Sequence, residues 1–279
     1  MGRPASTLLV ALAGIASLLS GCVALRSPAP AGVAAPSQEA TRFRARMIHD
    51  GAIPELADWE TWITFYYTDP QPRRTVGAMR FFAERGDLER NPQPIAVFFG
   101  RVFAQNPKSV SLWVDDLRAL PEDAHFVTAL ALWFSHVPDR DMLLDRLGEG
   151  GSTRVTRYVA LVKSDVAPDL TTIEVRQPVE LDMLWASFFA TGDTRFLERI
   201  VHVIPPAMEP GSTVPLPAGA RWSLTANAVA HSTVLEFCRR QASLQPERAA
   251  TLNDIVARAE AERGRIASQP AGEPAARRR

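Results

Sequence analysis

Three groups of acidic residues carry side chains that could perform acid–base chemistry. Each group lies beside a tryptophan or where a helix is expected to open: Asp115 with Asp116, Asp139 with Asp141, and Asp58 with Glu60. A glycoside hydrolase needs two carboxylates set several ångströms apart across a sugar-sized cleft. The chain also has six tryptophans, whose rings could stack on sugars. Hydrolysis of glycans by paired carboxylates is therefore one possible function.

The same residue types also have a structural explanation. A carboxylate at the first position of a helix caps free backbone N–H groups, which accounts for Asp58, Asp139 and Asp193. Four tryptophans fall on apolar stripes, where packing in the core is expected: Trp62, Trp113, Trp133 and Trp185. Capping and core packing therefore explain these residues without catalysis, and we favour that interpretation.

The sequence shows no motif that binds a metal or a cofactor. It has no His-Glu-x-x-His helix, no phosphate-binding glycine loop and no Gly-x-Ser-x-Gly elbow. None of the five histidines is spaced three or four residues from another: His49, His125, His136, His202 and His231. His125 and His136 could share a helix face, but two ligands do not make a metal site. We predict no metal and no cofactor.

A candidate ligand groove involves four other residues. Asp182 lies in the first turn of an apolar helix, where a carboxylate suits the helix dipole, and Trp185 follows one turn later. Trp222 and Asn227 come after a loop rich in proline and glycine and could pack back on that helix. The four residues form either a polar clamp between helices, which we favour, or a groove that binds a ligand.

The N-terminal segment has a pattern that indicates secretion and covalent modification of one cysteine. A basic residue, Arg3, precedes a short apolar run over residues 8–18, as in a secretory signal. The run is too short to span a membrane. It ends in Leu19-Ser20-Gly21-Cys22, which resembles the lipobox of bacterial lipoproteins. The alternative is an ordinary signal peptide with a chance cysteine.

The lipobox resemblance implies where the protein is held. It implies cleavage before Cys22, acylation of the cysteine with palmitate among the chains, and stable membrane anchoring by more than one acyl chain. Val23 stands where an aspartate would favour retention at the inner membrane, so the resemblance favours the outer membrane, facing the periplasm. Cys238 is then left without a disulfide partner and is expected to be a small buried hydrophobe.

Composition divides the chain into four parts. After the predicted signal peptide (residues 1–21), residues 22–38 are rich in proline and alanine and read as a tether. A helical domain is expected over residues 39–267, and residues 268–279 form a tail rich in arginine. The formal net charge is zero, which gives no support for binding of nucleic acid or for a polybasic membrane patch.

Apolar residues recur with the helical period through the predicted domain. Examples are residues 59–66, 95–103, 126–134 and 196–204, each ended by proline or a glycine turn. Two segments rich in β-branched residues, 153–162 and 171–175, are candidates for short strands or irregular structure. Residues 205–219 are expected to form a long loop. We predict an all-α antiparallel array of about ten helices, similar in style to a solenoid.

Two segments resemble each other: Phe81–Arg90, and Phe188–Asp193 followed at a distance by Leu197-Glu198-Arg199. Each has the pattern of an aromatic helix end, a glycine cap and an aspartate that opens the next helix. Stacked helical pairs would give this pattern, and so would ordinary turn chemistry. Further motifs, among them residues 181–193, 221–228 and 66–72, resemble a family of uncharacterised helical bacterial proteins over about Asp58 to Cys238. That resemblance implies a helical domain and supplies no catalytic residue.

These observations favour one function over another. We expect a lipid-anchored, non-enzymatic helical module that binds a protein of the cell envelope, with residues 205–219 as the expected contact segment. The alternative is an envelope glycan hydrolase that uses paired carboxylates.

Overall fold

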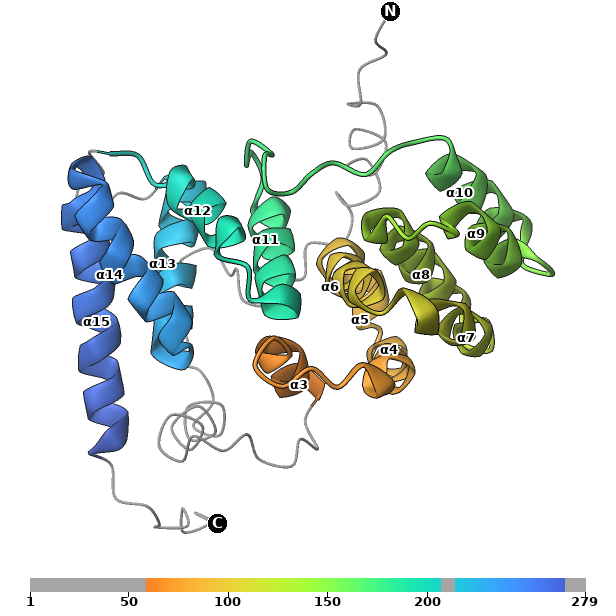
Figure 1. Ribbon diagram of the computed structural model, residues 1–279, viewed down its shortest axis with the longest axis horizontal. Coiled ribbons are helices and arrows are strands. Elements are labelled where there is room, and N and C mark those ends of the chain that lie inside the picture. The colour runs from red at the N-terminus through yellow and green to blue at the C-terminus, as the bar shows by residue number, and fades with distance from the viewer. Residues whose placement is uncertain (1–58, 207–213, 269–279) are drawn as a thin grey trace, which may run out of the picture. The chain divides into compact units, whose positions relative to one another are not determined.

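The structure is a computed structural model that describes residues 59–206 and 214–268 (Figure 1). These residues form thirteen α-helices and two 3-10 helices with no strand among them, so the predicted all-α fold is confirmed. No described helix is long and apolar enough to cross a membrane. The predicted signal peptide, Cys22, the tether and nearly all of the tail lie outside the described residues.

The described helices divide into two compact units, with the boundary inside helix α12 (Thr194–Val203). Each unit is described by itself. Within the predicted helical region 39–267, residues 59–199 belong to the first unit, and the described residues from 200 onward belong to the second.

The first unit contains ten helices if the start of α12 is included. Before α12 they are α3 (Trp59–Phe65), α4 (Thr75–Glu84), α5 (Asp87–Arg90), α6 (Pro92–Gln105), α7 (Pro107–Leu117), α8 (Glu122–Ser135), α9 (Arg140–Gly148), α10 (Thr153–Lys163) and α11 (Pro178–Thr191), with a 3-10 helix at Pro72–Arg74. Several of these helices open at a proline, whose fixed φ and missing N–H suit the first helical position.

Three helices, α6, α8 and α11, form the centre of the first unit. They are apolar around most of their circumference, as a fully buried helix must be. Helix α6 packs on both of the others, and these are the most extensive helix pairs among the described residues. Trp62 of α3 and Tyr66, which directly follows that helix, meet Phe98 of α6 edge to face, with ring centroids 5.7 and 5.4 Å away. The predicted core role of Trp62, Trp113, Trp133 and Trp185 is confirmed, since all four are buried.

A glycine sets how closely α6 and α8 approach. A Cβ added at Gly100 would lie 2.8 Å from the carbonyl oxygen of Ala131 and 2.9 Å from the Cβ of Phe134. Both distances are shorter than real Cβ atoms tolerate. The two backbones can therefore be this close only because residue 100 has no side chain.

The segment 153–162, a candidate strand in the sequence, is helical and forms most of α10. Val155, Val159 and Val162 lie on one face and are buried, because helical spacing brings them together. Ser152 caps the helix: its side chain accepts a hydrogen bond from the Val155 N–H at 3.2 Å. Residues 173–176 of the other candidate region are irregular.

The two similar segments are confirmed as glycine turns. Gly86 has φ +69° and Gly192 has φ +70°, the left-handed conformation that glycine adopts without strain. Asp87 opens α5, and its buried carboxylate pairs with Arg85 at 3.0 Å and with Arg90 at 2.5 Å. Asp193 precedes α12 and accepts from the Arg195 N–H at 2.9 Å.

The second unit is built on α13 (Pro215–Ala230), α14 (Ser232–Leu244) and α15 (Ala249–Ala267), with a 3-10 helix at Pro246–Arg248. Helix α15 packs on both α13 and α14. Helices α13 and α14 are separated at His231, whose backbone is extended. The predicted loop 205–219 is wrong in its last part, because α13 already begins at Pro215; residues 207–213 lie outside the described residues.

We predict that Gly100→Ala lowers the free energy of unfolding by about 2 kcal/mol, because the added methyl group overlaps α8. Gly264→Ala is the matched control: it lies in α15 with open space around a new Cβ. That variant should gain about 0.5 kcal/mol from the better helix propensity of alanine. Chemical denaturation followed by circular dichroism measures both. Equal effects of the two substitutions would contradict the close approach at Gly100.

Candidate functional site

A surface groove lies between α9 and α10 in the first unit. Its volume is about 550 Å³. Its lining comes only from these two helices and the residues that flank them: Asp141, Asp145, Gly148, Glu149, Thr156, Val159, Ala160, Lys163 and Ser164. The two helices form a hairpin closed by Gly150, which has φ +72°. The groove is therefore formed entirely by two consecutive helices and the residues that flank them.

The two walls of the groove differ in chemistry. Asp141, Asp145 and Glu149 follow one another at four-residue spacing, so the α9 wall carries a row of carboxylates. The side chains of Asp141 and Asp145 are 57% and 61% exposed. The α10 wall carries Thr156, Ala160 and Ser164 at the same spacing. One wall is acidic, and the other carries small uncharged side chains together with Lys163.

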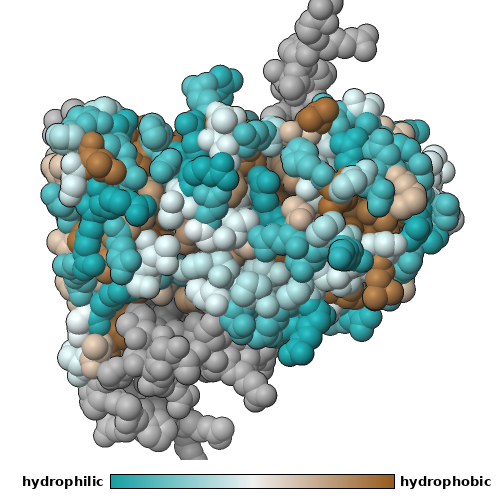
Figure 2. Space-filling model, in the orientation of Figure 1, coloured by the Kyte–Doolittle hydropathy of each residue, from teal (hydrophilic) through white to brown (hydrophobic). Residues whose placement is uncertain are grey.

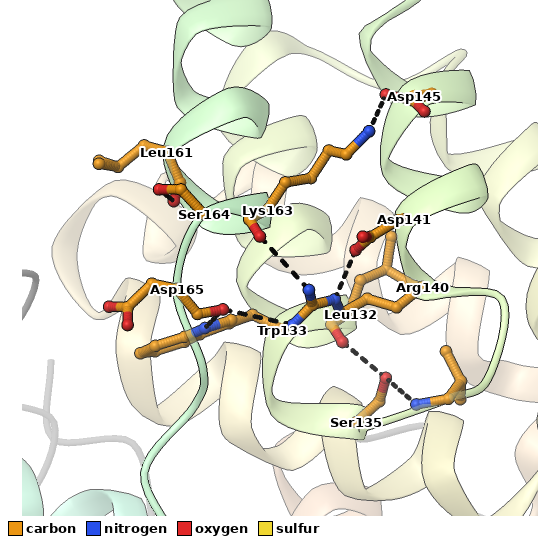
Figure 3. Close-up of polar contacts among 11 residues, drawn as sticks. Leu132, Trp133, Ser135, Arg140, Asp141, Asp145, Leu161, Lys163, Ser164 and Asp165 are labelled. Atoms are coloured by element: carbon orange, nitrogen blue, oxygen red, sulfur yellow. Dashed lines mark hydrogen bonds and ion pairs between the residues drawn. The ribbon is translucent and has the colours of Figure 1, made fainter. Parts of the chain in front are cut away.

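A network of polar contacts fixes the end of the groove where α9 begins and α10 ends (Figure 3). The Arg140 guanidinium donates to Asp141 at 2.8 Å and to the backbone carbonyls of Asp165 at 3.4 Å and Lys163 at 3.5 Å. The Trp133 Nε1–H donates to the same Asp165 carbonyl at 3.2 Å. A cation is well placed here, because the last carbonyls of a helix have no partner within the helix.

Lys163 spans the groove in the same view. Its ammonium lies 2.6 Å from the Asp145 carboxylate (Figure 3). It is the one cation among the lining residues, against three carboxylates. Glu149 makes no ion pair with any described residue, although its backbone carbonyl accepts from Arg118 at 2.9 Å. The groove therefore carries a local excess of negative charge.

The acidic pairs predicted from sequence do not form a cleft pair in the part of the chain that the structure describes. Asp115, Asp116, Asp139 and Asp141 are all exposed. Asp115 lies 3.4 Å from Arg146, and Asp141 pairs with Arg140. Asp139 occupies the N-cap position of α9, but its side chain makes no capping hydrogen bond, so the predicted capping by this carboxylate is wrong. Glu60 pairs with Arg85 at 2.7 Å, and Asp58 lies outside the described residues. The hydrolase alternative gains no support from these positions.

The predicted ligand groove draws its four residues from both units. Asp182 and Trp185 lie on α11 of the first unit, and Trp222 and Asn227 lie on α13 of the second. Trp185 is buried, its ring stacks on Phe189 at 5.7 Å, and its Nε1–H has no hydrogen-bond partner among residues 59–206 and 214–268. Trp222 is 54% exposed, and the Asn227 amide donates to the Ser223 carbonyl on its own helix. A groove formed by all four stays a prediction.

The described histidines and Cys238 do not gather into a metal site. No three His, Cys, Asp or Glu side chains among the described residues are arranged to hold a metal ion. His125 bonds the Arg118 carbonyl at 3.1 Å, and His136 ends α8 with φ 53°. Cys238 is fully buried, as expected for a small hydrophobe, and burial raises the pKa of its thiol to about 12. His49 and Cys22 lie outside the described residues.

A charged cluster around Arg101 was not anticipated from the sequence. Its guanidinium lies over the Phe196 ring at 5.3 Å, and burial lowers its pKa while Asp169 and Asp193 act to raise it. Its Nε–H is buried and has no hydrogen-bond partner in the described part of the chain. The two carboxylates balance a cation that the core partly encloses, which accounts for the cluster structurally.

Comparison of the chain with family models, with curated proteins and with solved structures finds no match. The resemblance of about Asp58 to Cys238 to uncharacterised helical bacterial proteins therefore stays a prediction. Sequence reasoning also missed most of the groove, since it noted Asp141 alone among the lining residues. The signal was the four-residue spacing of Asp141, Asp145 and Glu149.

Asp182 is the predicted site residue whose ionisation the fold changes most. It is half-buried on α11, and burial raises the pKa of its carboxyl from 3.8 to about 7. No hydrogen bond or ion pair from a described residue reaches this carboxylate. A lone carboxyl with this pKa can exchange a proton near neutral pH. A glycosidase pair would need a second carboxylate, and no charged group contributes to this shift.

We predict that Asp182→Asn stabilises the protein above pH 7. A raised folded-state pKa means that the protonated carboxyl contributes stability fully below about pH 3.8, and that this stability is lost as the pH rises through about 7. The variant should therefore exceed the parent by about 2 kcal/mol at pH 8 and match it near pH 4. Denaturation curves across this pH range measure the difference.

Asp193→Asn is the matched control with the opposite sign. A hydrogen bond from Arg195 is the largest cause that holds the pKa of Asp193 below 3.8. Its contribution to stability is present above that value and is lost at lower pH. This variant should be less stable than the parent at pH 8. An Asp182→Asn variant that loses stability at pH 8 would contradict the burial of a lone carboxyl.

Proposed function

We propose that this protein is a lipid-anchored helical scaffold of the bacterial cell envelope that binds another protein and is not an enzyme. The groove between α9 and α10 is the observation that supports it: a preformed hollow with charged walls, open to solvent. Such surfaces between helices suit contacts with protein segments. On the face drawn in Figure 2, hydrophilic residues predominate and apolar ones occur in small separate patches. We therefore propose a polar contact with the partner and no large apolar interface on that face.

The anchor is the second part of the proposal, and its support comes from sequence. Cys22 closes a lipobox-like segment and is followed by residues rich in proline and alanine. Acylation there would hold the helical units at the periplasmic face of a membrane, with the outer membrane favoured by Val23.

We predict that Cys22→Ser abolishes both lipid attachment and membrane fractionation, because the thiol is the acylated group. Labelling of growing cells with an azido analogue of palmitate, followed by fractionation, measures both. Cys238→Ala is the control: its thiol is buried in α14, so the label should remain. A Cys22→Ser chain that keeps the label and stays with membranes would refute the anchor.

We predict that a photoreactive amino acid in the groove captures one discrete partner in intact cells. Thr156 and Ser164 are exposed lining positions suited to the probe. Leu112, which is 65% exposed and outside the lining, is the control position. Val214, 58% exposed, tests the contact segment expected from sequence. The groove fails as the binding surface if Thr156 and Ser164 give no crosslink, or give the same products as Leu112.

A further inference from the structure

Helix α13 of the second unit exposes large apolar side chains. Trp222 is 54% exposed, and Val214, which directly precedes the helix, is 58% exposed. The half-buried Ala218 and Ala226 stand four residues before and after Trp222, so these three share one side of the helix. The Ala218 N–H bonds the Val214 carbonyl at 3.0 Å, so the helical repeat extends back to Val214. We call these four residues the α13 face.

No charged side chain interrupts the α13 face. Arg221 is the single charged residue of α13, and its guanidinium is held 2.8 Å from Asp254 of α15. A surface helix usually carries charged residues on its outer side. The other two helices of this unit do so, with exposed residues of both signs: Glu236, Arg239 and Arg240 on α14, and Arg258, Glu260 and Arg265 on α15. The α13 face therefore differs from its neighbours in the same unit.

Polar side chains near the α13 face are bonded to the backbone of their own helix. The Thr225 hydroxyl donates to the Arg221 carbonyl at 2.9 Å, and the Asn227 amide donates to the Ser223 carbonyl at 2.9 Å. Thr225 and Asn227 are only half-buried, so water could reach both. Bonds within the helix suit an apolar environment, where a donor without a partner is costly. This pairing and the missing charge both indicate an apolar occupant.

Tryptophan favours one apolar occupant in particular, a lipid bilayer. Its large ring is apolar and its N–H is polar, so it is enriched where acyl chains meet water. The proposed anchor at Cys22 is joined to the helices by residues 23–58, which keeps them close to a bilayer. A tethered surface needs little affinity of its own, because the tether keeps its effective concentration high. A small apolar face is then sufficient for contact.

We infer that the α13 face lies on the bilayer that holds the lipid anchor, with Trp222 between the headgroups and the acyl chains. This inference rests on the proposed anchor and adds a second membrane contact to it. The contact uses no charge, so uncharged phosphatidylcholine is a sufficient lipid.

The test places a fluorescent bimane label on α13 and measures its distance from lipid. The lipidated chain is assembled in phosphatidylcholine nanodiscs, with and without bromine on the acyl chains, because bromine quenches bimane at short range. The label is attached to Ala226→Cys, and to Ala257→Cys as the matched control, an exposed alanine of α15. Cys238 does not react, because burial raises the pKa of its thiol to about 12.

We expect brominated lipid to remove at least about half of the emission at Ala226→Cys, because an interfacial helix lies about 5–10 Å into the acyl-chain boundary. The label at Ala257→Cys should lose little. Adding Trp222→Glu should abolish most of the quenching at Ala226→Cys, because a carboxylate is costly to place in lipid. Adding Leu244→Glu instead puts the same charge at a position of α14 that is 65% exposed, and should leave the quenching unchanged.

Three results would overturn the inference: equal quenching of the two labels, quenching that survives Trp222→Glu, and equal losses from Trp222→Glu and Leu244→Glu. Circular dichroism shows that each variant is folded. A discrete protein captured by a photoreactive residue at position 222 in intact cells would also overturn it, since a protein would then cover the face.

A second form of the chain separates this inference from the proposed anchor. The Cys22→Ser chain, begun at residue 22, is held on the same nanodiscs by an N-terminal histidine tag and a nickel-chelating lipid. Quenching at Ala226→Cys in this form supports the membrane contact of α13 even if Cys22 proves not to be acylated. Loss of the quenching in both forms, with Cys22 acylated, rejects the α13 contact and leaves the anchor standing.

Discussion

The close approach of α6 and α8 at Gly100 is the constraint on which the first unit depends. Because residue 100 has no side chain, the backbones of the two helices pack directly against each other. A Cβ built at Gly100 would lie only 2.8 and 2.9 Å from atoms of α8, so the contact has no space for a methyl group. Helix α6 also packs on α11, so its position decides where two other helices lie. Helices α9 and α10 both pack on α8. The groove is therefore positioned, through α8, by a contact far from its own residues.

Arginine side chains hold the ends of many of these helices. Five of them donate to backbone carbonyls distant in sequence: Arg118 to Glu149, Arg140 to Asp165, Arg199 to Ile173, Arg248 to Ile204 and Arg263 to Val229. Carbonyls at helix ends and in irregular segments lack partners in regular structure, and a guanidinium has several donors to supply them. Connections without regular structure, such as residues 173–176, can be tied to the helices in this way.

The helices could be predicted because their periodicity is strong, whereas the groove could not. Phe98, Phe99, Val102 and Phe103 recur as a buried helix requires, and Gly86 and Gly192 stand where left-handed turns end helices. The segment 153–162 was ambiguous because β-branched residues favour strands locally. It is helical because a helix brings Val155, Val159 and Val162 to one face, where all three are buried. Asp182 was expected in the first turn of its helix, which is wrong, because α11 begins at Pro178 and the acidic residue of its first turn is Glu180. The raised pKa of Asp182 arises from burial by tertiary packing, which the sequence does not display.

The groove depends on which helices become neighbours, and this is set by long-range packing rather than by local pattern. The negative charge of the groove is related to the arginines that donate to backbone carbonyls. The chain has equal numbers of acidic and basic residues. Arg140 and Arg248 bond a carboxylate as well as a carbonyl. An arginine that bonds a carbonyl and no carboxylate leaves one carboxylate without a close cation. Arg118 illustrates this: it bonds the backbone of Glu149 while the Glu149 side chain has no ion pair among the described residues. Carboxylates left over in this way must remain in solvent, because burial without a partner is costly. A chain of zero net charge can thus present an acidic wall on its surface, and net charge alone does not indicate what such a surface binds.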